Sequence, residues 1–114
     1  MIRLFILFEA TSFLVAALIH SGFLIGGYEH SRARIAETVI AAALLAGLGL
    51  TLIRPDLLRS VGMAVQGFAL LGTLVGILTI AVGVGPRTVP DVIYHIVIVI
   101  VLVLGLRVAM QQLS

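Results

Sequence analysis

Long apolar stretches alternate with short polar connectors along the whole chain. Four stretches, each of about 20 residues, run over positions 4–25, 35–53, 58–82 and 89–110. A helix that rises about 1.5 Å per residue crosses a bilayer in that length. The last stretch is rich in β-branched residues, yet it is expected to be helical because lipid offers its backbone no hydrogen-bond partner. The pattern predicts an all-α integral membrane protein, a bundle of four transmembrane helices with short connectors.

The connectors carry most of the charge and are too short to fold on their own. Pro55 and Pro90 lie at or just before expected helix starts, where proline is well tolerated. The first apolar run is longer than the roughly 7 to 15 residues of a signal-peptide core and contains Glu9, so we expect it to remain as the first span. His30 follows that span and is expected in the connector. We therefore expect residues 1–114 to form a single membrane domain.

The composition agrees with a lipid bilayer as the surroundings of the chain. Hydrophobic residues make up 61% of the sequence and charged residues 11%, and the mean hydropathy is +1.29, as in membrane proteins. The absence of cysteine excludes disulfides, thiolate chemistry and cysteine-ligated iron–sulfur clusters. The net charge of +2 comes from arginines near span ends, so we expect no nucleic-acid partner. No pattern for covalent catalysis is present, and a non-enzymatic function is favoured.

The arginines give a small bias for orientation. Four spans place both termini on the same side as the second connector. That side carries Arg3, Arg54, Arg59 and Arg107, and the other side carries Arg32, Arg34 and Arg87. Basic residues are enriched in cytoplasmic connectors. We therefore expect a bacterial inner-membrane protein with cytoplasmic termini.

Ionisable residues inside the spans are the strongest functional signal. Such groups cost at least ~2.5 kcal/mol in a membrane helix and usually face the bundle interior. Counted from the middle of each span, His20, Glu37 and His95 all lie about 6 to 11 Å from the midplane toward the first connector. We expect them to line an intramembrane site for a ligand, a divalent metal or haem b. Asp91 and Tyr94, near His95, are expected to orient these groups.

Each of these residues also has a structural interpretation. A histidine in a membrane helix often only hydrogen-bonds a neighbouring helix. Glu37 and Asp91 lie close enough to helix starts to be first-turn acids that the helix dipole favours. The predicted site therefore depends on whether the helices that carry His20, Glu37 and His95 are neighbours.

A second hypothesis starts from Glu9, which lies more than a turn inside the first span. A buried carboxyl can exchange a proton for a cation, as a proton-coupled carrier of small molecules or ions requires. Gln66 is expected at the same depth and within hydrogen-bonding reach of Glu9. The length, the four-span layout and Glu9 resemble the small multidrug resistance transporters in outline. The tryptophan of that family's third span is missing here, and the resemblance carries over Glu9 alone.

A third hypothesis is a structural role, because small residues recur at helical spacing. Such residues let helix backbones approach closely. The residues in question are Gly22 and Gly26, at and just after the end of the first span, and Gly72, Gly76 and Gly83, in and after the third. They predict packing within the bundle, a homo-oligomer, or an accessory subunit of a larger membrane complex.

Overall fold

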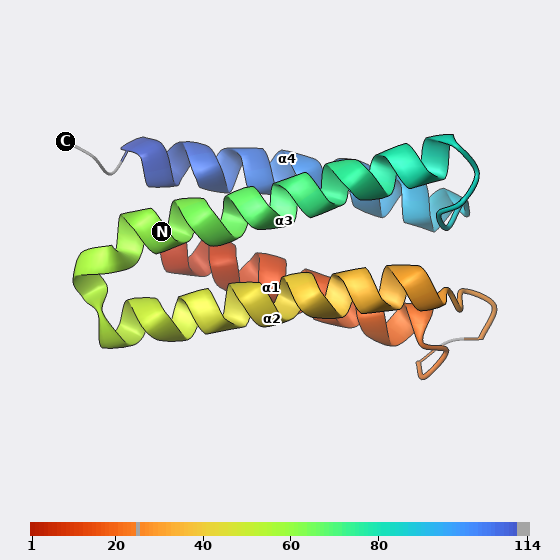
Figure 1. The fold of residues 1–114 in the computed structure, drawn as a ribbon, viewed down its shortest axis with the longest axis horizontal. Coiled ribbons are helices and arrows are strands. Elements are labelled where there is room, and N and C mark those ends of the chain that lie inside the picture. The colour runs from red at the N-terminus through yellow and green to blue at the C-terminus, as the bar shows by residue number, and fades with distance from the viewer. Residues whose placement is uncertain (25, 112–114) are drawn as a thin grey trace.

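The computed structural model describes residues 1–24 and 26–111, and these residues form four long helices. They are α1 (Ile2–His20), α2 (Ser31–Ile53), α3 (Leu58–Ala81) and α4 (Val89–Gln111), with a short 3-10 helix η1 (Pro55–Leu57) before α3. Each long helix is apolar enough and long enough to cross a membrane. No strand occurs in the part of the chain that is described. The predicted all-α fold with four membrane-spanning helices is confirmed (Figure 1).

Two antiparallel hairpins, α1–α2 and α3–α4, lie side by side (Figure 1). The start of α1, the end of α4 and the η1 connector lie at one end of the bundle, which we call the terminal end. The other two connectors, residues 21–30 and 82–88, lie at the opposite end, which we call the loop end. The bundle is 45 Å long, which exceeds the roughly 30 Å of a bilayer's hydrocarbon core. The two ends therefore reach the polar headgroup regions.

The helix bounds differ from the expected spans at the first connector. The first helix ends at His20, five residues before the expected position 25. Gly22 and Gly27 have φ values of +77° and +97°, which favour glycine and end regular helix. The second helix begins earlier than expected because His30 caps it, its Nδ1 accepting a hydrogen bond of 3.1 Å from the Ala33 N–H. His20 therefore lies at a helix end.

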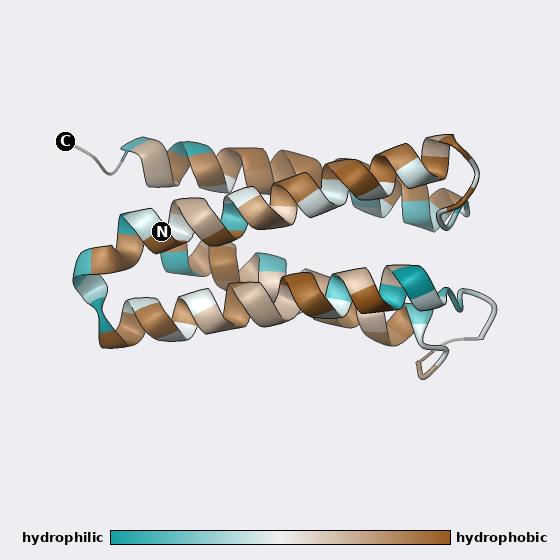
Figure 2. Cartoon of the chain, viewed as in Figure 1, coloured by the Kyte–Doolittle hydropathy of each residue, from teal (hydrophilic) through white to brown (hydrophobic). Residues whose placement is uncertain are grey.

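The outside of the bundle is as apolar as its core. Figure 2 shows hydrophobic residues along all four helices, with hydrophilic ones gathered mostly at the ends. Large hydrophobic side chains, such as Leu7, Leu71 and Ile100, are exposed. Because lipid tails surround membrane helices, exposure of such side chains costs no hydrophobic free energy. Helix contacts instead use small buried residues, among them Ala10, Ala41, Ala69 and Ala109.

Only two of the five predicted packing glycines lie at helix contacts. A Cβ on Gly72 would come within 2.9 Å of Ile40 Cδ1, and one on Gly76 within 3.1 Å of His95 Nε2, so both glycines of α3 lie against neighbouring helices. Gly22, Gly26 and Gly83 lie in connectors, beyond the ends of α1 and α3.

Candidate functional site

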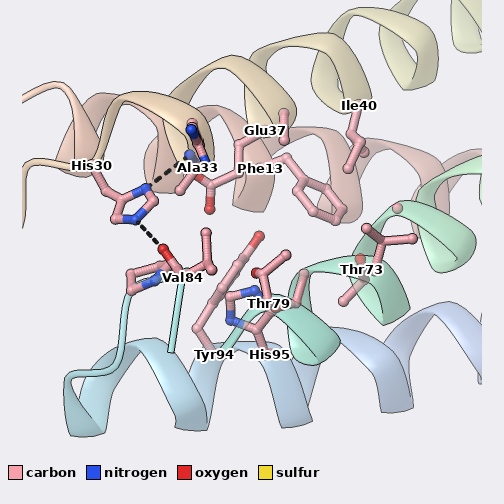
Figure 3. A pocket seen from close by; sticks show the side chains of 17 residues that line it. Phe13, His30, Ala33, Glu37, Ile40, Thr73, Thr79, Val84, Tyr94 and His95 are labelled. Atoms are coloured by element: carbon pink, nitrogen blue, oxygen red, sulfur yellow. Dashed lines mark hydrogen bonds between the residues drawn. The ribbon is translucent and has the colours of Figure 1, made fainter. Parts of the chain in front are cut away.

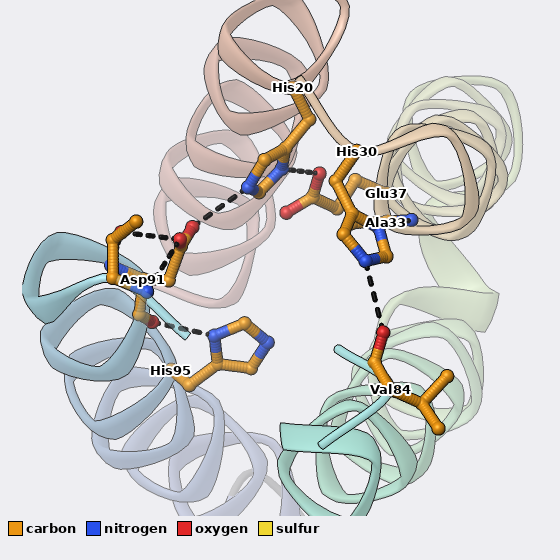
Figure 4. A network of polar contacts seen from close by, with 8 residues as sticks. His20, His30, Ala33, Glu37, Val84, Asp91 and His95 are labelled. Carbon is orange, nitrogen blue, oxygen red and sulfur yellow. Dashed lines mark hydrogen bonds and ion pairs between the residues drawn. The ribbon is translucent and has the colours of Figure 1, made fainter. Parts of the chain in front are cut away.

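The His20 imidazole lies between two carboxylates at the loop end (Figure 4). Its Nδ1 is 2.5 Å from Glu37 Oε1 of α2, and its Nε2 is 2.8 Å from Asp91 Oδ1 of α4. All three side chains are buried. Because a carboxylate only accepts hydrogen bonds, hydrogens on both ring nitrogens satisfy both contacts. We call these three residues the His20 network.

Local structure explains why Asp91 reaches His20. Asp91 lies in the first turn of α4, where the helix dipole stabilises an acid. The Thr88 hydroxyl donates to Asp91 Oδ2, and the Asp91 N–H donates to Thr88 Oγ1 over 3.3 Å. This reciprocal pair resembles a capping box. Oδ2 is thus used within α4, while Oδ1 points across to His20. Asp91 is both a first-turn acid and a partner of His20.

The predicted trio of His20, Glu37 and His95 is only partly brought together. His20 and Glu37 are in contact, but the third member of the group is Asp91, which was predicted only to orient the others. The His95 Nδ1–H donates to the Asp91 carbonyl oxygen over 2.7 Å, and its Nε2 faces Gly76 of α3. His95 lies one turn deeper than Asp91 and points toward α3, away from His20.

The ligand prediction for a metal or haem b gains no support from this geometry. Within residues 1–24 and 26–111, no group of three or more histidine, cysteine, aspartate or glutamate side chains is arranged to hold a metal ion. Both nitrogens of His20 already face carboxylate oxygens, and Nδ1 of His95 is bound to a backbone carbonyl. The imidazole lone pairs that a metal needs are therefore mostly engaged.

His30 has a role that the sequence analysis did not identify. Its Nδ1 caps α2, and its Nε2–H donates to the Val84 carbonyl oxygen over 3.1 Å (Figure 4). The second contact joins the connector between α1 and α2 to the connector between α3 and α4. The signal in the sequence is weak, because an N-cap is more often serine, threonine, aspartate or asparagine. His30 nevertheless ties the two hairpins at the loop end.

A cavity of about 260 Å³ lies beside the His20 network, between α2, α3 and the first turns of α4 (Figure 3). Phe13 of α1 and Tyr94 of α4 form its inner wall, with ring centroids 6.1 Å apart in an edge-to-face arrangement. The Tyr94 hydroxyl is buried and has no hydrogen-bond partner among the described residues. The other polar residues that line the cavity are His30, Arg32, Glu37, Thr73, Thr79 and His95. Tyr94, which was predicted to orient the site residues, is therefore part of the wall of this cavity.

A second hollow, of about 600 Å³, follows α1 and α4 on the other side of the network. Phe8, Ser12 and Tyr28 line it together with His20 and Asp91. Tyr94 lines both hollows. The buried His20 network therefore lies between this hollow and the cavity.

Glu9 and Gln66 meet nearer to the terminal end, around Gly105 of α4. A Cβ on Gly105 would lie 2.8 Å from Glu9 Oε2 and would collide with Gln66 Oε1. Both side chains have an exposed fraction of 0%. Neither oxygen of Glu9 has a hydrogen-bond partner in the described part of the chain, and the same holds for Gln66 Oε1. The Gln66 Nε2–H donates to the Gly62 carbonyl oxygen over 3.0 Å.

Glu9 and the cavity are separated by one turn of α1. Phe13 follows Glu9 by one turn and packs against Tyr94, and Glu9 is not among the residues that line the cavity. The interior of the bundle thus contains two polar regions. The Glu9–Gln66 pair lies toward the terminal end, and the His20 network with its cavity lies at the loop end.

Comparison of the chain with protein-family models, with curated proteins and with solved structures finds no match. The resemblance of Glu9 and the four-span layout to the small multidrug resistance transporters therefore remains one of outline. What the protein does has to be argued from its own residues.

Proposed function

We propose that the protein is a small proton-coupled membrane carrier in which Glu9 binds and releases the proton. The observation that carries this proposal is the burial of Glu9 without a polar partner for either oxygen. An ionisable group inside a membrane helix costs at least ~2.5 kcal/mol and usually marks an ion or proton pathway. An alanine or leucine would fill this position at lower cost if packing were the only requirement.

The surroundings of Glu9 suit a carboxyl group that alternates between a protonated and an ionised state. A protonated Glu9 has one O–H to donate. Gln66 Oε1, which also lies beside Gly105, can accept a hydrogen bond and receives none from the described residues. An ionised Glu9 has no hydrogen-bond partner for either oxygen among the described residues, and an isolated charge in an apolar surrounding is costly. Release of the proton therefore requires a cation or water to enter, which couples the two movements.

The polar groups between Glu9 and the loop end support a route for the proton. His20 lies on the same helix, about 16 Å from Glu9 along the axis. Tyr94 and Glu37 line the cavity, and the Glu37 carboxyl contacts His20. Hydroxyl, carboxyl and imidazole groups are the usual members of proton relays in membranes. We place the loop-end opening of this route at the His20 network.

Reconstitution into vesicles tests the carrier function. Proteoliposomes with a trapped pH indicator and an acidic interior are diluted into a medium that contains tetramethylammonium, a cation that cannot lose a proton, and the rise of the internal pH is followed. The wild type should exchange internal protons for the cation faster than protein-free vesicles release them, and Glu9→Gln should abolish the difference. Glu29→Gln, which changes an exposed acid of the first connector, is the matched control and should behave like the wild type. Equal rates for Glu9→Gln and wild type would contradict the proposal.

We place the carrier in a bacterial inner membrane with cytoplasmic termini, in contact with lipid and as a homo-oligomer. The support is the excess of one arginine at the terminal end and the apolar outer surface of the helices. Carriers built from few helices gain a larger interior by assembling copies.

The His20 network favours a second candidate function, the binding of a ligand or cofactor without transport. Its two carboxylates and one imidazole come from three helices and lie beside a cavity, an arrangement that packing alone does not require. An optical spectrum and elemental analysis of the purified protein test this candidate. A haem band or a stoichiometric metal that disappears in His20→Ala/His95→Ala would favour it over the carrier, and a colourless, metal-free protein would exclude haem b and a tightly bound metal.

A further inference from the structure

We propose that the cavity beside Glu37 binds a small organic ammonium ion. This inference rests on the proposed carrier function and names the class of its cargo. The cavity and its wall residues carry the argument, and Glu9, which lies outside the cavity, takes no part in it.

The inner wall of the cavity offers mainly hydrogen-bond acceptors, because the protein already uses most of the wall's side-chain hydrogens. Thr73 and Thr79 donate their hydroxyl hydrogens to backbone carbonyls of α3. His95 donates Nδ1–H to a backbone carbonyl, so its Nε2 is left as an acceptor. The threonine oxygens keep lone pairs as well. A ligand that donates several hydrogen bonds fits such a wall.

Two further groups of the wall are available to a ligand. The contact of Glu37 with His20 uses Oε1, which leaves Oε2 to accept a hydrogen bond. Figure 3 shows the Tyr94 hydroxyl pointing toward the side of the cavity where Glu37 and Phe13 lie. That hydroxyl has no partner in the described chain, and a buried polar group without a partner is costly. An N–H donor placed between Glu37 and Tyr94 satisfies both.

The charge of the neighbourhood favours a cation. The His20 network combines two carboxylates with one imidazole, so it carries a net negative charge even when the imidazole is protonated. The rings of Phe13 and Tyr94 present aromatic surface to the same space, and aromatic faces attract ammonium groups. Arg32 also lines the cavity, but it is exposed at the loop end. The inner part of the cavity therefore attracts positive charge.

Size and apolar wall area favour an organic cation over a metal ion. The volume of about 260 Å³ is far more than one bare ion fills and lies just below the roughly 300–1,000 Å³ of pockets for drug-sized ligands. Ile40, Val84 and Pro86 complete the wall with apolar surface. This apolar surface packs against the hydrocarbon group of the ligand, while the hydrogen-bond acceptors of the inner wall bind its ammonium group.

Binding is tested on the full chain in lipid nanodiscs, without any gradient. Fluorine NMR follows para-fluorobenzylammonium, with para-fluorobenzyl alcohol as the neutral probe of the same shape. The ammonium should bind and the alcohol should not. Glu37→Gln keeps an oxygen for His20 but removes the charge, and it should weaken binding about 10- to 100-fold. Tyr94→Phe, which leaves the His20 network untouched, should weaken binding about 3- to 10-fold.

The matched control is Glu29→Gln, which removes a carboxylate from the same end of the bundle outside the cavity and should leave binding unchanged. Equal binding of the alcohol, full displacement of the probe by sodium ions, or unchanged binding in Glu37→Gln would overturn the assignment. The vesicle assay tests the carrier function independently of this binding experiment. Binding without Glu9-dependent proton movement would leave the ammonium site standing and remove the transport role, whereas proton movement without binding would remove only the site.

Discussion

His20 at the end of α1 and Asp91 at the start of α4 face each other across the two hairpins, with 2.8 Å between Nε2 and Oδ1. The other ring nitrogen of His20 contacts Glu37 within its own hairpin. One imidazole thus connects three helices at the loop end. Because all three side chains are buried, the contacts are shielded from solvent screening. The His20 network therefore holds the two hairpins together at this end.

Removal of the imidazole should destabilise the bundle strongly. His20→Leu leaves Glu37 and Asp91 buried without their shared partner, and loss of one side of a buried ion pair costs about 3–5 kcal/mol. Unfolding in detergent, followed by circular dichroism, measures this change. Adding Glu37→Gln and Asp91→Asn to His20→Leu removes the unpaired charges and should recover most of the loss. A single variant as stable as the wild type would show that the contacts do not hold the hairpins.

The close approach around Gly105 should not tolerate a side chain. In Gly105→Ala, the new methyl group collides with Gln66 Oε1 and crowds Glu9 Oε2, so we expect a loss of about 1–3 kcal/mol in the free energy of unfolding. Gly67→Ala is the matched control. A Cβ on Gly67 meets nothing within 4 Å, and alanine favours a helix over glycine by up to about 1 kcal/mol. Opposite signs for the two variants are expected, and equal effects would argue against the contact.

The two contacts of His30 can be separated by substitution. His30→Ala removes both the cap of α2 and the hydrogen bond to Val84, and the loss of a cap alone costs about 0.5–2 kcal/mol. Asparagine is a good capping residue, so His30→Asn should retain the cap and lose only the link between connectors. Thermal melting should therefore rank wild type above His30→Asn and His30→Ala lowest. Identical melting of all three would exclude both roles.

Labelling of single cysteines tests the orientation. The chain has no cysteine, so Ser31→Cys, Ser60→Cys and Thr88→Cys each introduce one exposed thiol near an end of the bundle. A membrane-impermeant maleimide added to intact cells should label positions 31 and 88, which lie at the loop end, and should label position 60 only after permeabilisation. The reverse pattern would place the termini outside the cytoplasm.

The fold was largely predictable because lipid imposes a simple rule. A bilayer requires long apolar helices, and the hydropathy pattern locates them without tertiary information. The end of the first helix was placed too late because apolar residues follow His20 at positions 23–25, while Gly22, with a positive φ, ends the helix at His20. Hydropathy does not report backbone conformation.

The depth of the site residues along their helices was predictable from the sequence, but the direction in which each side chain points was not. The predicted shared level of His20 and Glu37 agrees with their contact. Glu9 and Gln66 both lie beside Gly105, but the expected hydrogen bond between them is not formed among the described residues. The sequence could not show that Asp91, and not His95, contacts His20. Both residues lie on one face of α4, and only the packing of α4 against α1 decides which of them reaches His20. Depth follows from counting residues, whereas helix rotation depends on packing.

The most direct test of the account is the infrared spectrum of the carboxyl groups in lipid. A proton on Glu9 produces a carbonyl band of a protonated carboxylic acid, distinct from the bands of ionised carboxylates. The account predicts that this band is present in the wild type at neutral pH, is lost in Glu9→Gln, and shifts in Gln66→Leu, where the acceptor for the Glu9 O–H is removed. An unchanged band in Glu9→Gln would show that Glu9 holds no proton and would contradict its role in transport.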